Sequence, residues 1–400
     1  MAVRSIPLFL LLSTLACRSV MAHPELDLKS TTDLISYWGY PVESHRVITE
    51  DGYILTMHRI PHGKTQGPSN TSRPVFYLQH PLTGSSSDWV LNKPSQSLAF
   101  MLADQGYDVW LGNVRGNTYS RNHITMKPSQ RKFWDFSFQE HGKYDFPAMI
   151  NHVLNKTGEQ QLYYVGHSQG TIMAFTGLTE NTELKSKIKL FFALAPVTRL
   201  RNVSWNIKKL ASTKDTIYFF YNFFGIYEVL PASRFKKFAG SLMCNWIPYI
   251  CKSISNVLNS QYGEGSKNLN ETRLPIYFYH RPAGTSLKNL MHYFQEVKSG
   301  RFEKYDYGVL GNFKRYGTWS APEYDISKID VPTVIISGSI DGLAPPRDVK
   351  WTREQLPNVI KFVEIKDYNH NDLLLAITAA KEINSRIIRI TKRLEIKELS

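Results

Sequence analysis

The chain has 400 residues, of which 42% are hydrophobic and 20% are charged. This length and balance exclude a disordered chain and leave room for one large core or two domains. The formal net charge is +14. Lysine and arginine are spread along the chain and do not form a basic tract within a recognisable module, so the charge does not indicate nucleic-acid binding. They gather mildly at residues 381–397, which indicates either a solvated helix face or an affinity for anionic lipid surfaces.

The first residues have the pattern of a secretory signal peptide. Arg4 supplies positive charge, residues 6–12 form an apolar run, and Val20-Met21-Ala22 offers a cleavage site. Because the run is too short to span a bilayer, we expect residues 1–22 to be removed, leaving a mature chain that is secreted or lysosomal. No other apolar run approaches spanning length, so no transmembrane anchor is expected.

In a protein of the secretory pathway, Asn-x-Ser/Thr sequons can be glycosylated and cysteines can form disulfides. Four Asn-x-Ser/Thr sequons become candidate glycosylation sites, namely Asn70, Asn155, Asn202 and Asn270. Removal of Cys17 with the signal leaves Cys244 and Cys251. We favour a short-loop disulfide between them in an oxidising compartment, with two free thiols as the alternative. No metal site is expected, because no His or Cys partners cluster nearby.

Strand-like and helix-like segments alternate along most of the chain, which predicts an α/β protein with a mostly parallel sheet. The expected strands are residues 45–48 and 53–60, forming a hairpin, then 75–79, 107–111, 162–165, 190–194 and 331–338. The expected helices are 97–104, ended by Gly106, then 145–154, 171–178 and a final surface helix near 381–397.

The alternation fades between residues 200 and 325, a stretch that contains the aromatic run 218–224. We interpret it as a cap inserted into one core, which is formed by residues 23–199 and 326–400. The aromatic run indicates either an apolar substrate or ordinary packing within the cap.

The central motif is Gly166-His167-Ser168-Gln169-Gly170, a G-x-S-x-G that follows a predicted strand and precedes a predicted helix. This context identifies the nucleophile elbow of an α/β-hydrolase, in which a sharp turn exposes the serine hydroxyl. Glycines on both sides allow the backbone to crowd together. The sequence therefore predicts Ser168 as the nucleophile.

A serine nucleophile needs a base, and in this fold the order along the chain is Ser, acid, His. Asp341 lies just beyond the predicted strand 331–338, and His370 is the only histidine that follows it. We therefore predict Asp341 as the acid and His370 as the base. Asp348, farther past the strand, and Asp367, close to His370 in sequence, are the rival acids.

Two backbone N–H groups are expected to bind the oxyanion. One belongs to Gln169, directly after the nucleophile, and the other to the loop that follows strand 75–79. That loop begins His80-Pro81-Leu82. Because proline has no N–H, Leu82 is the predicted second donor, while His80 is interpreted as a structural residue that shapes the loop.

The chain resembles the animal acid lipase family, which includes gastric and lysosomal acid lipases, and is most similar to its insect members. The resemblance covers residues 36–379. It rests on residues 37–41, 50–53, 106–113, 115–118, 133–138, 166–170, 282–286 and 368–370.

The resemblance implies that Ser168, Asp341 and His370 are the catalytic triad, and that Leu82 and Gln169 are the oxyanion donors. It also implies a cap with a mobile lid, with Cys244 and Cys251 at the place of a cap disulfide.

Two stretches depart from the family pattern. The family usually has glycine where this chain has Pro81, which puts the position of the Leu82 N–H in question. Residues 140–143, Glu-His-Gly-Lys, also differ, and we interpret that difference as variation on the surface.

These observations predict a serine lipase that hydrolyses ester bonds of neutral lipids, triacylglycerol or cholesteryl ester, at a lipid–water interface without a metal or cofactor. The alternative is a lipid-binding or storage relative that has lost catalysis, since fold does not determine function. The presence of all three predicted triad residues favours the enzyme. The oligomeric state cannot be predicted from the sequence, and nothing specific indicates a peptidase.

Overall fold

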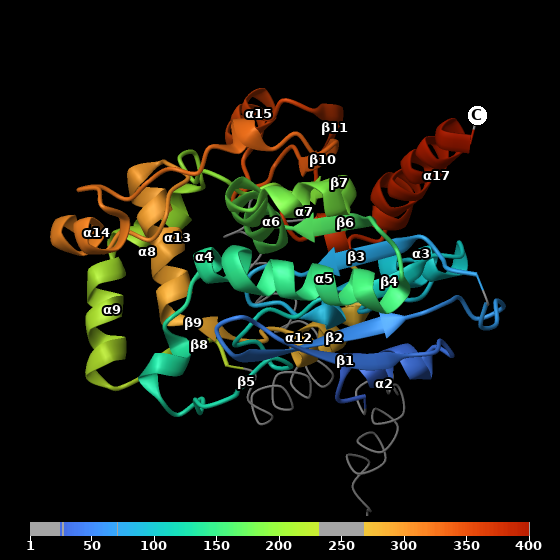
Figure 1. Cartoon of the computed structure of the whole chain (residues 1–400), viewed down its shortest axis with the longest axis horizontal. Coiled ribbons are helices and arrows are strands. Elements are labelled where there is room, and N and C mark those ends of the chain that lie inside the picture. Colours follow the sequence, from blue (N-terminus) through green and yellow to red (C-terminus); the bar gives the residue numbers. More distant parts are fainter. Residues whose placement is uncertain (1–24, 26–27, 70, 232–267, 400) are drawn as a thin grey trace, which may run out of the picture.

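The computed structural model describes residues 25, 28–69, 71–231 and 268–399, with side chains to residue 397 (Figure 1). The predicted signal peptide, the sequon at Asn70 and the cysteines Cys17, Cys244 and Cys251 lie outside the described residues.

A nine-stranded sheet forms the centre of the described residues, in the order β1-β2-β4-β3-β6-β7-β10-β11, with β5 beside β2. The pairs β1–β2, β2–β4 and β2–β5 are antiparallel, and every pair from β4 to β11 is parallel. The strands are β1 (Glu43–Ile48), β2 (Tyr53–Ile60), β3 (Val75–Gln79), β4 (Asp108–Leu111), β5 (Asn122–His123), β6 (Leu162–His167), β7 (Ile188–Leu194), β10 (Thr333–Gly338) and β11 (Val359–Ile365).

The central strands are covered on both faces, so every residue of β3 and of β6 is buried. Such strands are continuous apolar runs, which is why the sequence predicts β3 at its observed bounds. Aromatic rings align between them: Phe76 stacks on Tyr163 with centroids 4.9 Å apart, and Tyr77 on Tyr164 at 5.6 Å. The prediction omitted the edge strand β11, because its exposed polar residues interrupt the apolar pattern.

Helices flank this sheet, and α3 ends at the glycine expected to end it, while α5 ends at a glycine that was not singled out from the sequence. Helix α3 is followed by Gly106 with φ +95°, and α5 by Gly158 with φ +75°. The core helices are α2 (Thr31–Tyr37), α3 (Leu98–Asp104), α4 (Phe138–Glu140), α5 (Phe146–Thr157), α6 (Gln169–Glu180), α7 (Thr182–Lys187), α15 (Pro346–Gln355), α16 (Asp372–Leu375) and α17 (Ser385–Leu399). Short 3-10 turns are η2 (Ser86–Trp89), η3 (Arg131–Trp134) and η6 (Ile326–Lys328), and π-helical turns are η4 (His141–Asp145) and η7 (Ala380–Asn384).

The π-helical turn η4 corrects the interpretation of residues 140–143 as surface variation. His141 and Gly142 are buried, because this turn carries them against α6. A Cβ on Gly142 would lie 2.7 Å from Cβ of Thr176 and 2.9 Å from the backbone nitrogen of Gly177. The change from the family pattern therefore lies inside the core, next to the helix that begins at the predicted nucleophile.

Residues 200–325 are mainly helical where the structure describes them. Helices α8, α9 and α13 pack around a small second core of Ala211, Val229, Leu287, Met291 and Phe294. With α14 they lie at one end of the molecule, as Figure 1 shows. The elements are α8 (Trp205–Ser212), α9 (Lys214–Phe223), β8 (Glu228–Val229), η5 (Glu271–Arg273), α12 (Leu274–His280), β9 (Thr285–Ser286), α13 (Leu287–Ser299) and α14 (Val309–Tyr316).

The last helix, α17, extends from the opposite end of the molecule (Figure 1). The expected surface helix is partly embedded, because Ile383 of η7 and Ile387 of α17 are fully buried. Glu395 accepts hydrogen bonds of 3.1 Å from the hydroxyls of both Tyr107 and Tyr163, at the amino ends of β4 and β6. In the part of the chain that the structure describes, no helix is long and apolar enough to cross a bilayer.

Candidate active site

Ser168 occupies a sharp turn between β6 and α6. Its φ is +52° and its ψ is −112°, a conformation that is strained for a residue with a side chain. A Cβ on Gly166 would lie 2.7 Å from the carbonyl carbon of Gly170, and a Cβ on Gly170 would lie 2.5 Å from the oxygen of Gln79. The turn thus requires glycine at both positions, as the motif predicts.

Asp341 and His370 meet beside this edge of the sheet, where loops follow β10 and β11. Nδ1 of His370 lies 2.8 Å from Oδ2 of Asp341, and both residues are buried. The other oxygen of Asp341, Oδ1, accepts the backbone N–H groups of Leu343 and Ala344 at 2.8 Å each. A carboxylate held in this way fixes the proton on Nδ1, which leaves Nε2 to act as a base.

Of the two rival acids, one is engaged by other residues and the other is exposed. Asp348 accepts hydrogen bonds of 2.7 Å from the backbone and side-chain nitrogens of Asn202, and one of 3.3 Å from Arg199. Asp367 is exposed, with φ +59°. The geometry therefore favours Asp341 as the partner of His370.

The Leu82 amide lies in a tight turn that begins at Pro81 and is closed by a 3.0 Å hydrogen bond from Gly84 N to Pro81 O. Within the described residues the Leu82 N–H donates to no acceptor, as expected of a group kept for a ligand. Because proline has no N–H and this turn uses only the carbonyl of Pro81, the geometry tolerates proline at this position.

His80 holds the start of the same turn. Its Nε2 accepts from Val114 N at 3.3 Å and from Asn117 Nδ2 at 3.2 Å, so the proton is on Nδ1, which donates to Pro81 O at 2.8 Å. Burial lowers the pKa of His80 to about 4. A neutral ring with both nitrogens engaged suits the structural role expected of this residue.

Gln169 begins α6, so its backbone N–H is one of the unpaired amides of a helix start. Its side-chain oxygen accepts from Asn289 Nδ2 at 2.7 Å, and the same nitrogen lies 3.0 Å from Thr285 Oγ1. A residue of α13 thereby holds the first residue of the helix that follows Ser168. No pattern in the sequence indicated Asn289.

His167, the variable second residue of the motif, contacts His370, the predicted base. Its Nε2 lies 3.0 Å from the backbone oxygen of His370, and the two rings have centroids 4.9 Å apart. Burial lowers the pKa of His167 far below its ordinary value, so the neutral ring donates from Nε2. The sequence could not reveal this contact, because the motif leaves this position open.

Segment 281–286 is hydrogen-bonded to the turn at residues 81–84, called here the oxyanion turn because it carries the predicted donor Leu82. Ala283 N donates to Thr83 O at 2.7 Å, while Arg281 forms an ion pair with Asp88 and lies 3.4 Å from Asn371 Oδ1. Arg281 therefore links the region after the oxyanion turn with the region after His370. The sequence places residues 282–286 among the family stretches without indicating this contact.

Strand order, the turn at Ser168 and the Asp341–His370 pair define an α/β-hydrolase. A family model described as "Partial alpha/beta-hydrolase lipase region" matches residues 31–93, and one described as "alpha/beta hydrolase fold" matches residues 74–235. The crystal structure of a putative lipase from Acinetobacter baumannii superposes with a TM-score of 0.53 at 16% identity, over 92% of this chain and 96% of that one. The predicted fold is confirmed.

Sequence relatives show which family of α/β-hydrolases the chain belongs to. The chain is 42% identical over 369 residues to gastric triacylglycerol lipase of Rattus norvegicus, covering 92% of each. It is 41% identical over 373 residues to lysosomal acid lipase/cholesteryl ester hydrolase of Macaca fascicularis, covering 93% of this chain and 92% of that one. The chain therefore belongs to the animal acid lipase family and is a carboxylic ester hydrolase, which confirms the predicted family.

Proposed function

We propose that this chain is a serine lipase that hydrolyses ester bonds of neutral lipids, triacylglycerol or cholesteryl ester, through an acyl-enzyme on Ser168. The observation that carries the proposal is the strained turn at Ser168 together with the buried His370–Asp341 pair. The names of the relatives, a triacylglycerol lipase and a cholesteryl ester hydrolase, support a neutral lipid as the substrate.

In the first half of the reaction, Nε2 of His370 takes the proton of Ser168 as Oγ bonds to the ester carbonyl carbon. The carbonyl π electrons move to oxygen, where the N–H groups of Leu82 and Gln169 stabilise the charge. Collapse of this intermediate breaks the ester C–O bond, and His370 gives its proton to the departing alcohol. Water, activated by His370, then attacks the acyl-enzyme and releases the fatty acid.

We place a cap over this site at residues 200–325, between the core segments 23–199 and 326–400, and we retain the predicted lid within it. The small hydrophobic core around Leu287 and Phe294 is separate from the core of the sheet, which supports a cap that packs as its own unit. Segment 281–286 and α13 reach the oxyanion turn and Gln169, so this cap helps to shape the catalytic surface.

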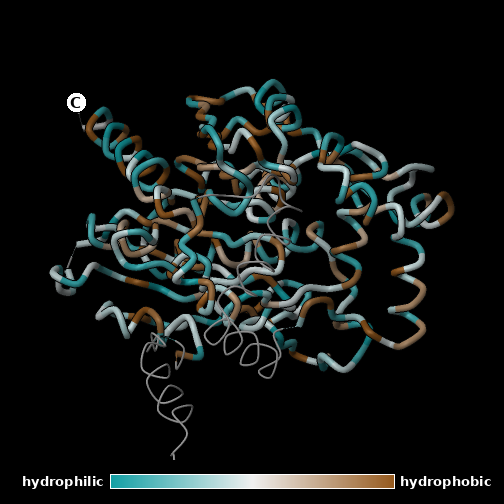
Figure 2. The backbone as a smooth tube through the Cα atoms, turned by 180° about the vertical axis from the view of Figure 1, so that it is seen from behind, coloured by the Kyte–Doolittle hydropathy of each residue, from teal (hydrophilic) through white to brown (hydrophobic). Residues whose placement is uncertain are grey.

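The aromatic run of α9 supports binding at a lipid–water interface. Phe219 is 62% exposed and Phe223 is 72% exposed, so these rings do not fill a core in the described structure. Leu310 on α14, at the same end of the molecule, is 80% exposed. Figure 2 shows apolar stretches at this end. A large exposed apolar surface is typical of proteins that bind membranes or other partners.

The relatives and the predicted signal peptide support a secreted or lysosomal protein. Among the described sequons Asn155 is exposed, whereas the side-chain nitrogen of Asn202 donates to Asp348 at 2.7 Å. A glycan on that nitrogen would have to fit beside Asp348 at a half-buried position, so we favour Asn155 over Asn202 as a glycosylation site. Asn270 lies at the start of η5 and remains a candidate, and the Cys244–Cys251 disulfide remains a prediction.

The decisive test is release of fatty acid from emulsified triolein by the secreted protein beside Ser168→Ala. We expect release to disappear in the variant while the thermal midpoint is unchanged. Asp341→Asn should lower kcat by about 10⁴-fold, the loss seen when a triad acid is neutralised. Asp367→Asn is the matched control and should keep full activity. A wild-type protein that hydrolyses neither triolein nor short soluble esters would instead indicate a lipid-binding relative.

Binding at the interface has its own test. Phe219→Ser with Phe223→Ser should reduce hydrolysis of emulsified triolein while leaving hydrolysis of a soluble p-nitrophenyl ester unchanged, because Ser168 and its partners are untouched. Ile360→Ser, at a half-exposed isoleucine on β11, is the control. Equal losses on both substrates would contradict a role limited to the interface.

A further inference from the structure

The outer face of α17 combines cations with exposed aliphatic side chains. Arg389, Lys392, Arg393 and Lys397 are exposed, and Ile396 is 66% exposed. At 3.6 residues per turn these positions fall on one face of the helix, with Ile396 near its middle. Ile387 and Thr391, on the opposite face, are buried.

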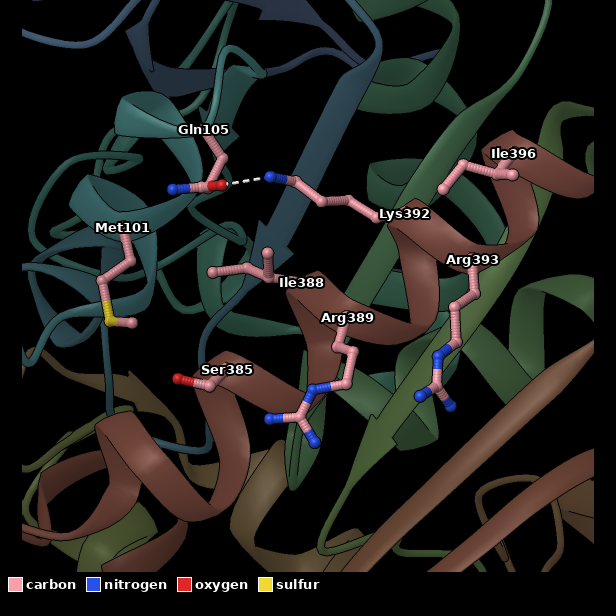
Figure 3. A pocket seen from close by; sticks show the side chains of 8 residues that line it. All are labelled: Met101, Gln105, Ser385, Ile388, Arg389, Lys392, Arg393 and Ile396. Carbon is pink, nitrogen blue, oxygen red and sulfur yellow. Dashed lines mark hydrogen bonds between the residues drawn. The ribbon is translucent and has the colours of Figure 1, made fainter. Parts of the chain in front are cut away.

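A groove separates this face from α3. Met101 and Gln105 line it on the α3 side, and Ile388, Arg389, Arg393 and Ile396 line it on the α17 side. Figure 3 shows the side chains of Arg389 and Arg393 extending from successive turns of α17 along the groove, while Lys392 turns to Gln105. The groove therefore offers an apolar floor with positive charge along one rim.

The acidic residues near α17 whose side chains the structure describes do not neutralise these arginines. Glu382 pairs with Arg386 at 2.9 Å, and Glu395 is engaged by the hydroxyls of Tyr107 and Tyr163. Among the residues that the structure describes, no ion pair is formed by Arg389 or Arg393. Two adjacent guanidinium groups without a counter-charge match the phosphate oxygens of a lipid headgroup.

From this arrangement we propose that α17 binds the surface of a membrane containing anionic phospholipid. Arg389 and Arg393 contact the phosphates, and Ile388 and Ile396 enter the apolar region beneath them, as in helices that lie in a membrane interface. Charge complementarity favours a membrane over a neutral lipid droplet, because a droplet of neutral ester offers no anions for the arginines.

This surface is separate from the candidate active site. Helix α17 bonds to the amino ends of β4 and β6 through Glu395, whereas Ser168 follows the carboxyl end of β6. Helices α8, α9, α13 and α14 lie at the other end of the molecule (Figure 1). The proposed contact would therefore tether the enzyme to an anionic membrane and leave the cap end free.

The test compares vesicles of phosphatidylcholine alone with vesicles of phosphatidylcholine and phosphatidylserine in equal parts, in a sedimentation assay with the full secreted chain. Wild type should bind the second kind, less so at high salt. Arg389→Gln with Arg393→Gln should weaken that binding roughly 30-fold, since each cation near such a surface contributes about a factor of five. Hydrolysis of neutral triolein emulsion should be unchanged.

The matched control is Arg347→Gln with Lys361→Gln, two exposed cations away from α17, with the same change in net charge. A control that loses as much binding as the α17 variant would show that net charge alone attracts the protein, and would overturn the proposal, as would undiminished binding of the α17 variant. Ile396→Trp adds a direct measure: its fluorescence should shift to the blue with anionic vesicles, and an unchanged spectrum would contradict insertion of this position.

Discussion

At the scale of single residues, the proposed base His370 is held by His167 as well as by Asp341. Asp341 fixes its ring through Nδ1, and His167 fixes its backbone through the carbonyl oxygen. The order of motifs along the sequence identified the first neighbour, because hydrolases of this fold share that order. The second neighbour could not be predicted, since a side chain contacting a backbone 203 residues away leaves no local pattern.

His167 is a positioning residue by this geometry, and its removal should affect the chemical step more than substrate binding. We expect His167→Leu to lower kcat about 10- to 100-fold on a soluble ester with little change in KM, because loss of a contact worth ~1–3 kcal/mol lets His370 move away from the position in which it accepts the Ser168 proton. His167→Gln, whose amide can donate, should recover part of the activity. Unchanged kcat in the leucine variant, or a loss that merely follows the thermal midpoint, would contradict this role.

At the scale of elements, the position of α6 depends on a close crossing with the π-helical turn η4. Gly142 and Gly177 face one another there: a Cβ on Gly177 would lie 2.8 Å from the oxygen of Gly142 and 2.5 Å from Cδ1 of Phe146. Since α6 begins directly after Ser168, the same crossing supports the nucleophile turn.

We expect Gly142→Ala to destabilise the protein by about 1–3 kcal/mol, the usual cost of overfilling a packed core, and to reduce activity by displacing α6. Urea unfolding followed by fluorescence measures the first effect, and hydrolysis of a soluble ester the second. Gly67→Ala is the control, because nothing lies within 4 Å of a Cβ at Gly67. Equal stabilities of the two variants would show that the crossing can relax.

Elements that are buried along most of their length were predicted well, because apolar residues recur along their sequences. Strands β2 and β3 have the expected bounds, and α6 begins two residues earlier than expected. Segments whose burial depends on distant partners were predicted less well: residues 140–143 were interpreted as surface variation, although His141 and Gly142 are buried in η4. The clamp from Ala283 to Thr83 joins segments 200 residues apart, which local periodicity cannot indicate.

At the scale of the whole molecule, several buried histidines make stability depend on pH. Burial lowers the pKa of His58 and His80 to about 4 and that of His292 to about 3. Burial also lowers that of His141, whose two ring nitrogens have no hydrogen-bond partner among the described residues. An unfolded chain binds protons at these residues below about pH 6.5 while the folded chain does not, so stability falls on acidification.

Because these buried histidines are protonated only after unfolding, the free energy of unfolding should be smaller at pH 5 than at pH 7. His141→Phe should reduce that loss by up to about 2 kcal/mol, from ~1.4 kcal/mol for each pH unit below 6.5. It should also stabilise the protein at pH 7, because it removes unpaired polar atoms from the core. Urea unfolding at the two pH values measures both effects, and an equal loss in wild type and variant would contradict the assignment of His141 as a buried neutral ring.

The clamp between Ala283 and the oxyanion turn has a consequence for how a bulky ester reaches the nucleophile. Thr83 accepts the Ala283 N–H and is adjacent to Leu82, whose amide is the predicted oxyanion donor. A movement of segment 281–286 away from the core would break this hydrogen bond and displace the Leu82 amide. Any path by which the ester enters must therefore leave segment 281–286 in place. Within the proposed cap, this segment belongs functionally with the catalytic core.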